Sequence, residues 1–127
     1  MTGMARFLLI CAGGAIGSGA RYLFSSAMAR AFGNFPFGTL GVNVLGSFLA
    51  SVVMVLALEK SALAPELRFF LVTGVLGGFT TYSSFNYETL HLAQSGAAGL
   101  AVVNVAVTLV ACLLAGGAGI WLARAVG

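Results

Sequence analysis

Charge is the scarcest feature of this sequence. Only 7% of the 127 residues are charged, aspartate is absent, and there is one histidine. A water-soluble domain carries about 25% charged residues, so this chain cannot cover a solvated surface. The lack of a plausible nucleophile–base pair argues against an enzyme, and a scattered net charge of +3 argues against a nucleic-acid partner. The composition predicts an integral membrane protein embedded in the lipid bilayer.

Cysteines are also few, and the chain is short. Cys11 and Cys112 are the only two, and both lie in apolar runs, which favours small buried thiols over a disulfide. A length of 127 residues allows one domain, so residues 1–127 are expected to form a single transmembrane unit.

Long uncharged runs, by contrast, are abundant. A helix needs about 20 apolar residues to span a bilayer. The uncharged runs and the turn residues between them predict four transmembrane helices, at about residues 5–31, 38–59, 66–94 and 97–124. The connections, residues 33–36 and 60–65, are short, and Pro36 and Pro65 lie where a helix can begin. The predicted fold is an all-α membrane domain.

The basic residues carry a weak orientation signal. Cytoplasmic loops are enriched in Lys and Arg, and the predicted layout gathers most of these residues on one side of the membrane. That side would hold Arg6, Lys60, Arg68 and Arg124. Arg30, and arguably Arg21, would lie on the other side. The bias favours cytoplasmic termini, but so few charges also permit insertion in both orientations.

Small residues recur at the spacing used by packed membrane helices. Gly13 and Gly17 form a GxxxG pair in the first predicted helix, and Gly74 and Gly78 form another in the third. Helices in lipid associate through such small residues and through polar contacts, so close packing is the favoured interpretation. Four thin helices enclose little space, and a polar route is easier to build between two copies of the chain.

Two ionisable residues lie within the predicted spans. Arg21 is about two-thirds along the first span, and Glu88 is near the end of the third. Such groups are costly in a membrane and are functional candidates, but a long side chain can also reach the headgroups. Both alternatives stay open. The two residues could also meet at a water-filled vestibule.

Neutral polar residues form a thin pattern on two helices. Asn43 lies in the middle of the second span, and its NH₂ group is a double donor that needs partners. Asn104, Thr108 and Cys112 recur every four residues in the last span and therefore share one face. Hydrogen bonding between helices and a permeation track explain this stripe equally well.

Residues 73–85 are the most informative segment. The Gly77-Gly78 pair is soon followed by two β-branched residues and two serines, a combination that makes a poor continuous helix. We expect the third helix to be broken at this glycine pair, near its middle. A break at membrane depth is tolerated where the backbone is buried or lines a cavity. It frees carbonyls that can bind a hard cation such as Na⁺ and exposes a helix N-terminus that favours anions.

Aromatic rings follow this expected break. Tyr82 and Phe85 are three residues apart and share a helix face. Because the edge of an aromatic ring is positive, such rings can solvate an anion without a fixed charge. The expected donors at membrane depth are mostly neutral, namely Asn43, Ser83, Ser84, Asn104 and Thr108. Since conduction requires weak binding at several sites, the set predicts a pathway for a small anion in an oligomer.

Three blocks of sequence together resemble the Fluc (CrcB) family of fluoride channels. Residues 13–22, GGAIGSGARY, resemble the family's motif GGxxGxxxRY; residues 38–48, GTLGVNVLGSF, resemble GTLxVNxxGxF; residues 74–85, GVLGGFTTYSSF, resemble GxxGGxTTFSTF. The blocks occur in the family's order, and the four-span layout covers essentially the whole chain. Each motif is weak alone, but jointly they are specific.

The resemblance implies a fold and a function. The fold is an antiparallel homodimer of four-helix subunits with dual topology, two pores, and a structural Na⁺ at the dimer interface. The function is passive fluoride export through the cell (inner) membrane. Hydrogen fluoride enters as a neutral acid and ionises inside, so a leak for the trapped anion lowers toxic cytoplasmic fluoride.

The resemblance also implies roles for individual residues. Asn43 falls at the position of a pore donor, and Tyr82 and Phe85 fall at the two positions of the family's phenylalanine box. The carbonyls of Gly77 and Thr80 fall where the central Na⁺ is held. Tyr82 replaces the usual phenylalanine and adds a hydroxyl that could itself donate to the ion.

Four further positions follow from the same resemblance. Arg21 and Glu88 match positions near the aqueous vestibules. Thr108, with Asn104 and Cys112, falls in the region of the family's polar track on the fourth helix, although that region has no sequence motif. Cys112 is an unusual member of such a track.

Two other functions fit the length and composition. A small multidrug-resistance-type transporter also has four spans, but it needs a carboxylate in its first helix to couple protons, where this chain has only Arg21. A non-conducting scaffold subunit is permitted by composition, but it would not explain the Gly77-Gly78 pair or Asn43.

Overall fold

The computed structural model describes residues 1–33 and 35–126, and this part of the chain is helical without strands. In chain order the elements are α1 (Gly3–Phe32), α2 (Phe37–Met54), η1 (Val55–Glu59), α3 (Pro65–Arg68), η2 (Phe69–Leu76), α4 (Gly77–Phe79), α5 (Tyr82–Gln94) and α6 (Ala98–Ala125). The all-α prediction is confirmed. Of the predicted connection 33–36, Asn34 lies outside the described residues.

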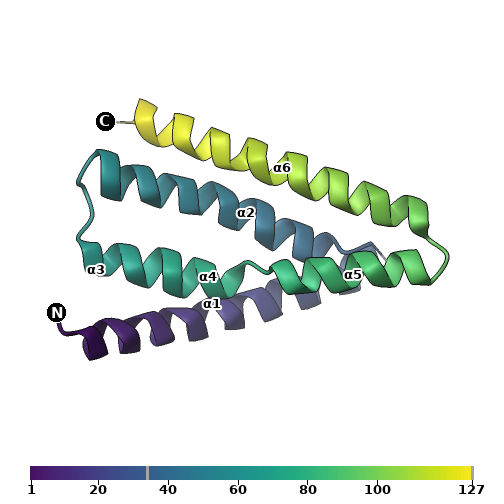
Figure 1. Cartoon of the computed structure of the whole chain (residues 1–127), viewed down its shortest axis with the longest axis horizontal. Helices are drawn as coiled ribbons and strands as arrows, with labels where there is room; N and C mark the ends of the chain where they lie inside the picture. Colours follow the sequence, from purple (N-terminus) through teal and green to yellow (C-terminus); the bar gives the residue numbers. More distant parts are fainter. Residues whose placement is uncertain (34, 127) are drawn as a thin grey trace.

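The helical segments run back and forth, so that both chain termini and α3 lie at the same end of the molecule (Figure 1). As predicted, Arg6, Lys60, Arg68 and Arg124 belong to this end, and Arg30 in the last turn of α1 belongs to the other. At the first end, Arg124 donates two hydrogen bonds to Glu59, at 2.7 and 2.9 Å, and joins α6 to η1.

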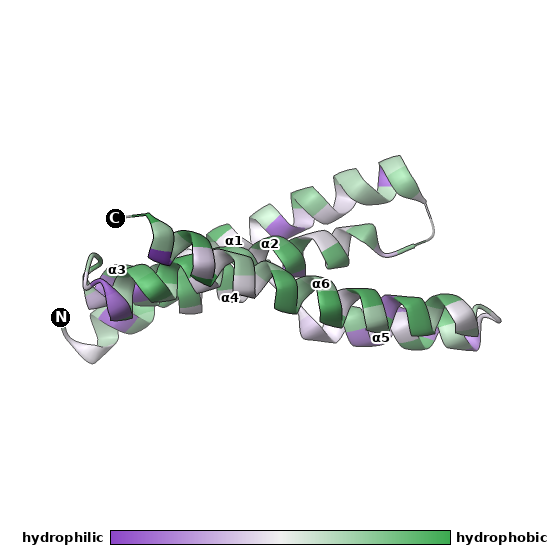
Figure 2. Cartoon of the chain, turned by 90° about the horizontal axis from the view of Figure 1, so that it is seen from above, coloured by the Kyte–Doolittle hydropathy of each residue, from purple (hydrophilic) through white to green (hydrophobic). Residues whose placement is uncertain are grey.

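Three continuous helical stretches are long and apolar enough to cross a membrane, namely Gly3–Phe32, Phe37–Glu59 and Ala98–Ala125. Most of their surface is not covered by the rest of the chain. Trp121, Leu113 and Leu114 are all about 70% exposed, and green apolar ribbon dominates these helices in Figure 2. Such a surface belongs in lipid or against another protein, and the chain is a multi-pass membrane protein.

The accessibility of the two cysteines reflects this open packing. Both are free, as predicted, but Cys11 is exposed and Cys112 is partly exposed. The prediction that both thiols are buried is therefore wrong for the single chain. Within the described residues nothing covers Cys11 on α1, and Cys112 on α6 lines an open groove.

Glycines hold α1 against the third helical segment. A β-carbon on Gly17 would overlap the Val75 carbonyl oxygen, and one on Gly78 would lie 2.6 Å from the Gly14 carbonyl oxygen. Neither backbone can yield, so only glycine permits this approach. The two predicted GxxxG pairs thus pack against each other, as helices in membranes do.

The third segment is broken near its middle, but not at the Gly77-Gly78 pair. Those glycines remain helical, and the extended residues are Thr80 (φ −83°, ψ 159°) and Thr81 (φ −153°, ψ 120°). The expected position of the break is corrected by three residues. The reason is tertiary, because the close packing of Gly78 on α1 keeps this part of the segment helical.

The break changes the helix against which the third segment packs. Before it, η2 and α4 pack on α1; after it, α5 packs on α6 and barely touches α2. Figure 2 shows the consequence, a fork in which α5 and α6 diverge from the ends of α1 and α2. The two threonines are therefore the point at which the third segment passes from α1 to α6.

Candidate functional site

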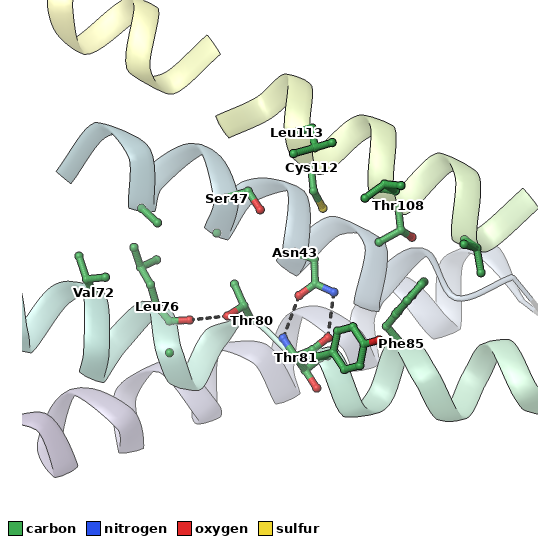
Figure 3. A pocket seen from close by; sticks show the side chains of 16 residues that line it. Asn43, Ser47, Val72, Leu76, Thr80, Thr81, Phe85, Thr108, Cys112 and Leu113 are labelled. Carbon is green, nitrogen blue, oxygen red and sulfur yellow. Dashed lines mark hydrogen bonds between the residues drawn. The ribbon is translucent and has the colours of Figure 1, made fainter. Parts of the chain in front are cut away.

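A groove of about 720 Å³ lies beside the break, between α2, η2, α4, α5 and α6. Its lining residues are Asn43, Gly46, Ser47, Ala50, Val72, Leu76, Gly77, Thr80, Thr81, Tyr82, Phe85, Val105, Thr108, Leu109, Cys112 and Leu113. None of these residues carries a charge. The lining is mainly apolar, and polar groups are concentrated around the break (Figure 3).

Asn43 binds the backbone of the break. Its Nδ2 donates to the Thr81 carbonyl at 2.9 Å, and its Oδ1 accepts from the Thr81 N–H at 2.8 Å. Figure 3 shows both bonds. The amide therefore replaces the helical bonds that Thr81 loses, which is how an extended residue is tolerated at membrane depth. One amide hydrogen of Asn43 remains beyond this pair.

The break also leaves other carbonyls without their helical donors. The Gly78 carbonyl accepts from Arg21 Nε at 3.1 Å. For the carbonyls of Gly77 and Thr80, no hydrogen-bond donor is found among residues 1–33 and 35–126. Both residues line the groove. Unwound backbone carbonyls are the ligands that membrane transporters use for Na⁺, so the chemistry of these two oxygens fits the implied ion.

Tyr82 and Phe85 lie at the start of α5. Thr81 caps this helix, since its Oγ1 accepts from the Ser84 N–H at 3.2 Å. The rings of Tyr82 and Phe85 are 5.9 Å apart with an angle of 60°, an edge-to-face arrangement. Both line the groove, and Tyr82 is 78% exposed. Ser83 and Ser84 are not among the lining residues.

The polar stripe of α6 is divided between two environments. Thr108 and Cys112 line the groove, as Figure 3 shows. Asn104 does not line it and is only 1% exposed. Its Nδ2 donates to Thr89 Oγ1 at 2.9 Å, and its Oδ1 accepts from Thr108 Oγ1 at 3.4 Å. In the single chain, Asn104 therefore links α6 to α5.

Thr89 extends this link. Its hydroxyl donates to the Phe85 carbonyl at 2.7 Å. The chain of hydrogen bonds from Thr108 through Asn104 and Thr89 therefore ends at Phe85, whose ring lines the groove. Sequence reasoning missed Thr89, because a threonine on a half-polar helix has no distinctive spacing. Its only signal is its place one turn after Phe85.

The two predicted vestibule residues do not contact each other. Arg21 is bound to the Gly78 carbonyl, while Glu88 Oε1 accepts from Thr39 Oγ1 at 2.8 Å. The second oxygen of Glu88 is buried and has no partner within the described part of the chain. Thr39 was also missed, although it lies one turn before Asn43 on the same face of α2.

The chain matches one known family over most of its length. The sequence model of the family described as "CrcB-like protein, Camphor Resistance (CrcB)" matches residues 8–120. A protein of Anaeromyxobacter sp. (strain K), named "Fluoride-specific ion channel FluC", is 56% identical over 122 residues, which are 95% of this chain and 97% of that protein.

More distant relatives carry the same name. The protein of Sorangium cellulosum (strain So ce56) is 53% identical, over 95% of this chain and 96% of its own length. That of Citrifermentans bemidjiense is 43% identical, over 96% of this chain and 99% of its own length. A match that covers most of the chain at these identities establishes the relationship, and the chain belongs to the CrcB-like family.

Proposed function

We propose that this chain is the subunit of a passive fluoride channel in the cell's inner membrane. The observation that carries the proposal is the uncharged groove in which the helix break, the Asn43 amide and the Tyr82–Phe85 ring pair meet. The name of relatives more than 50% identical supports fluoride as the ion.

The groove supplies the groups that a small anion needs in place of water. The remaining amide hydrogen of Asn43 is a neutral donor, and the edges of Tyr82 and Phe85 are weakly positive. The Thr108 hydroxyl would donate to the ion only after giving up its 3.4 Å bond to Asn104. Because no group holds a full charge, each contact is weak enough for the ion to move on, as conduction requires. Ser83, Ser84 and Asn104 remain predicted pore residues that would need to reach the ion from outside this groove.

A second copy of the chain would complete the path. The groove is open on one side, where Tyr82 is 78% and Leu113 68% exposed. These surfaces suit an antiparallel homodimer of four-span subunits with dual topology, in which each groove would form one of two pores. The weak charge bias between the two ends of the chain also suits insertion in both orientations.

A structural Na⁺ would sit at the dimer interface. One subunit offers the carbonyls of Gly77 and Thr80, which have lost their helical donors and belong to residues that line the open groove. Two copies would double this set of oxygens. When bound, the ion would neutralise the negative ends of the broken helices and join the subunits. Flux should therefore persist when Na⁺ is replaced only during the assay.

Arg21 and Glu88 would lie near the pore's aqueous ends. Arg21 already donates a hydrogen bond to the Gly78 carbonyl beside the break, and Glu88 accepts one from Thr39 on α2. In these positions they would shape the entrances rather than the ion path between the rings.

The proton-coupled transporter is disfavoured. α1 contains no carboxylate, and the relatives carry a channel's name. Purified protein in liposomes separates the candidates when fluoride and chloride efflux are followed with ion-selective electrodes. A channel releases fluoride and retains chloride. Substrate-dependent proton movement would indicate the transporter, and no efflux of either ion would indicate a scaffold.

A further inference from the structure

Two arginines from different helices lie against one aromatic ring. The guanidinium carbon of Arg6 in α1 is 4.6 Å from the centre of the Phe69 ring, and that of Arg68 in α3 is 5.1 Å away. Arg6 and Arg68 are far apart in sequence, and the packing of α1 on η2 brings them together. The ring fixes both side chains at short range.

Neither guanidinium forms a salt bridge within the described part of the chain. Over residues 1–33 and 35–126, the only salt bridge joins Arg124 to Glu59. The Nε of Arg6 is buried without an acceptor, so its terminal nitrogens are the part left for a partner. The distances of 4.6 and 5.1 Å to one ring centre place the two guanidinium carbons at most about 10 Å apart. Like charges within that range repel each other, and the ring face offsets only part of that cost. An anion at the terminal nitrogens would offset the rest.

The depth of this pair identifies the kind of anion. Helix α1 has 30 residues, so it is about 45 Å long, whereas the hydrocarbon core of a bilayer is about 30 Å thick. Its first turns therefore reach the headgroups, and α3 begins at the same end (Figure 1). The abundant anions at that depth are lipid phosphates, and the planar fork of arginine fits phosphate oxygens.

We propose that Arg6 and Arg68, held by Phe69, bind the phosphate group of an anionic membrane lipid. The shared ring keeps the two guanidinium groups in place, so little side-chain freedom is lost when the lipid binds. The site belongs to one subunit and does not depend on fluoride conduction.

The test uses the full-length protein in detergent, titrated with phosphatidylglycerol or with zwitterionic phosphatidylcholine. Bound lipid is counted by native mass spectrometry, and Tm is measured in parallel. Phosphatidylglycerol should bind more tightly and raise Tm more. In the Arg6→Gln/Arg68→Gln variant its affinity should fall on the order of fivefold for each arginine. Arg30→Gln removes one charge from the exposed far end of α1 and should retain the wild-type preference.

Three outcomes would overturn the proposal. One is equal binding of the two lipids by the wild-type protein, a measurement that does not depend on how any variant folds. The second is an Arg6→Gln/Arg68→Gln variant that binds phosphatidylglycerol as well as Arg30→Gln does. The third is inorganic phosphate raising Tm as much as phosphatidylglycerol, which would make the site one for free anions.

Discussion

Asn43 and Thr81 form a closed pair in which one side-chain amide satisfies both the N–H and the carbonyl of one backbone residue, at 2.8 and 2.9 Å. The pair joins α2 to the point where the third segment passes from α1 to α6. A single residue therefore holds the break and lines the groove, where the proposed function also makes it a donor to the ion.

The first prediction concerns this pair. Asn43→Leu leaves both Thr81 groups without partners, which should destabilise the fold by about 1–3 kcal/mol and abolish most fluoride flux. Thermal unfolding and liposome efflux measure the two effects. Asn86→Leu is the matched control, since Asn86 is exposed on α5. Equal behaviour of the two variants would remove Asn43 from both roles.

The second prediction separates ring edge from hydroxyl. Phe85→Ile keeps the apolar volume near that of the original but removes the positive edge, so fluoride flux should fall roughly tenfold while the dimer still forms. Tyr82→Phe keeps the edge and should retain conduction. Efflux and size-exclusion chromatography report on these two properties. A non-conducting Tyr82→Phe channel would make the hydroxyl essential.

The third prediction concerns the link from α6 to Phe85. If Asn104 acts by holding Thr89, then Asn104→Leu and Thr89→Val remove the same interaction. Their effects on unfolding free energy should be non-additive, with a coupling of about 0.5–3 kcal/mol. A double-mutant cycle measures this coupling. Additive losses of unfolding free energy would mean that Asn104 does not act through Thr89. Its amide would then be an independent donor, as a role in the pore requires.

The fourth prediction tests the glycine contact between α1 and η2. Gly17→Ala forces a β-carbon into the Val75 carbonyl and should cost about 1–3 kcal/mol of stability. Gly19→Ala lies on the same helix with nothing within 4 Å of the added carbon and should be neutral or stabilising. Thermal melts of the two variants provide the comparison. Equal melts would mean that this approach of the helices is not tight.

Much of the helical layout could be predicted because it depends on local composition. The uncharged runs, the turn before α6 and the helix-starting prolines mark the segments directly. The GxxxG pairs of Gly13 and Gly74 also point to close packing without any knowledge of the fold. In a membrane protein these signals are strong, since lipid excludes unpaired backbone.

The location of the break could not be predicted in the same way. Helix propensity places it at Gly77-Gly78, but that estimate ignores the packing of Gly78 on α1 and the pairing of Thr81 with Asn43. Both contacts join residues far apart in sequence. Helix propensity is a weak guide by itself. Here tertiary contacts place the break three residues after the position that propensity predicts.

The same limit applies to the polar residues. The spacing of Asn104 and Thr108 indicates one shared face, but it does not say that Asn104 is buried against Thr89 while Thr108 lines the groove. Likewise, Arg21 and Glu88 are recognisable as costly intramembrane groups. Their partners, the Gly78 carbonyl and Thr39, emerge only from the packing.

The central claim is that an uncharged groove beside the break conducts the smallest halide selectively. The most direct measurement is the efflux of fluoride and of chloride from liposomes that contain the purified wild-type protein. Rapid loss of fluoride with full retention of chloride is the predicted result. Equal release of both halides, or retention of both by a correctly assembled protein, would contradict the account.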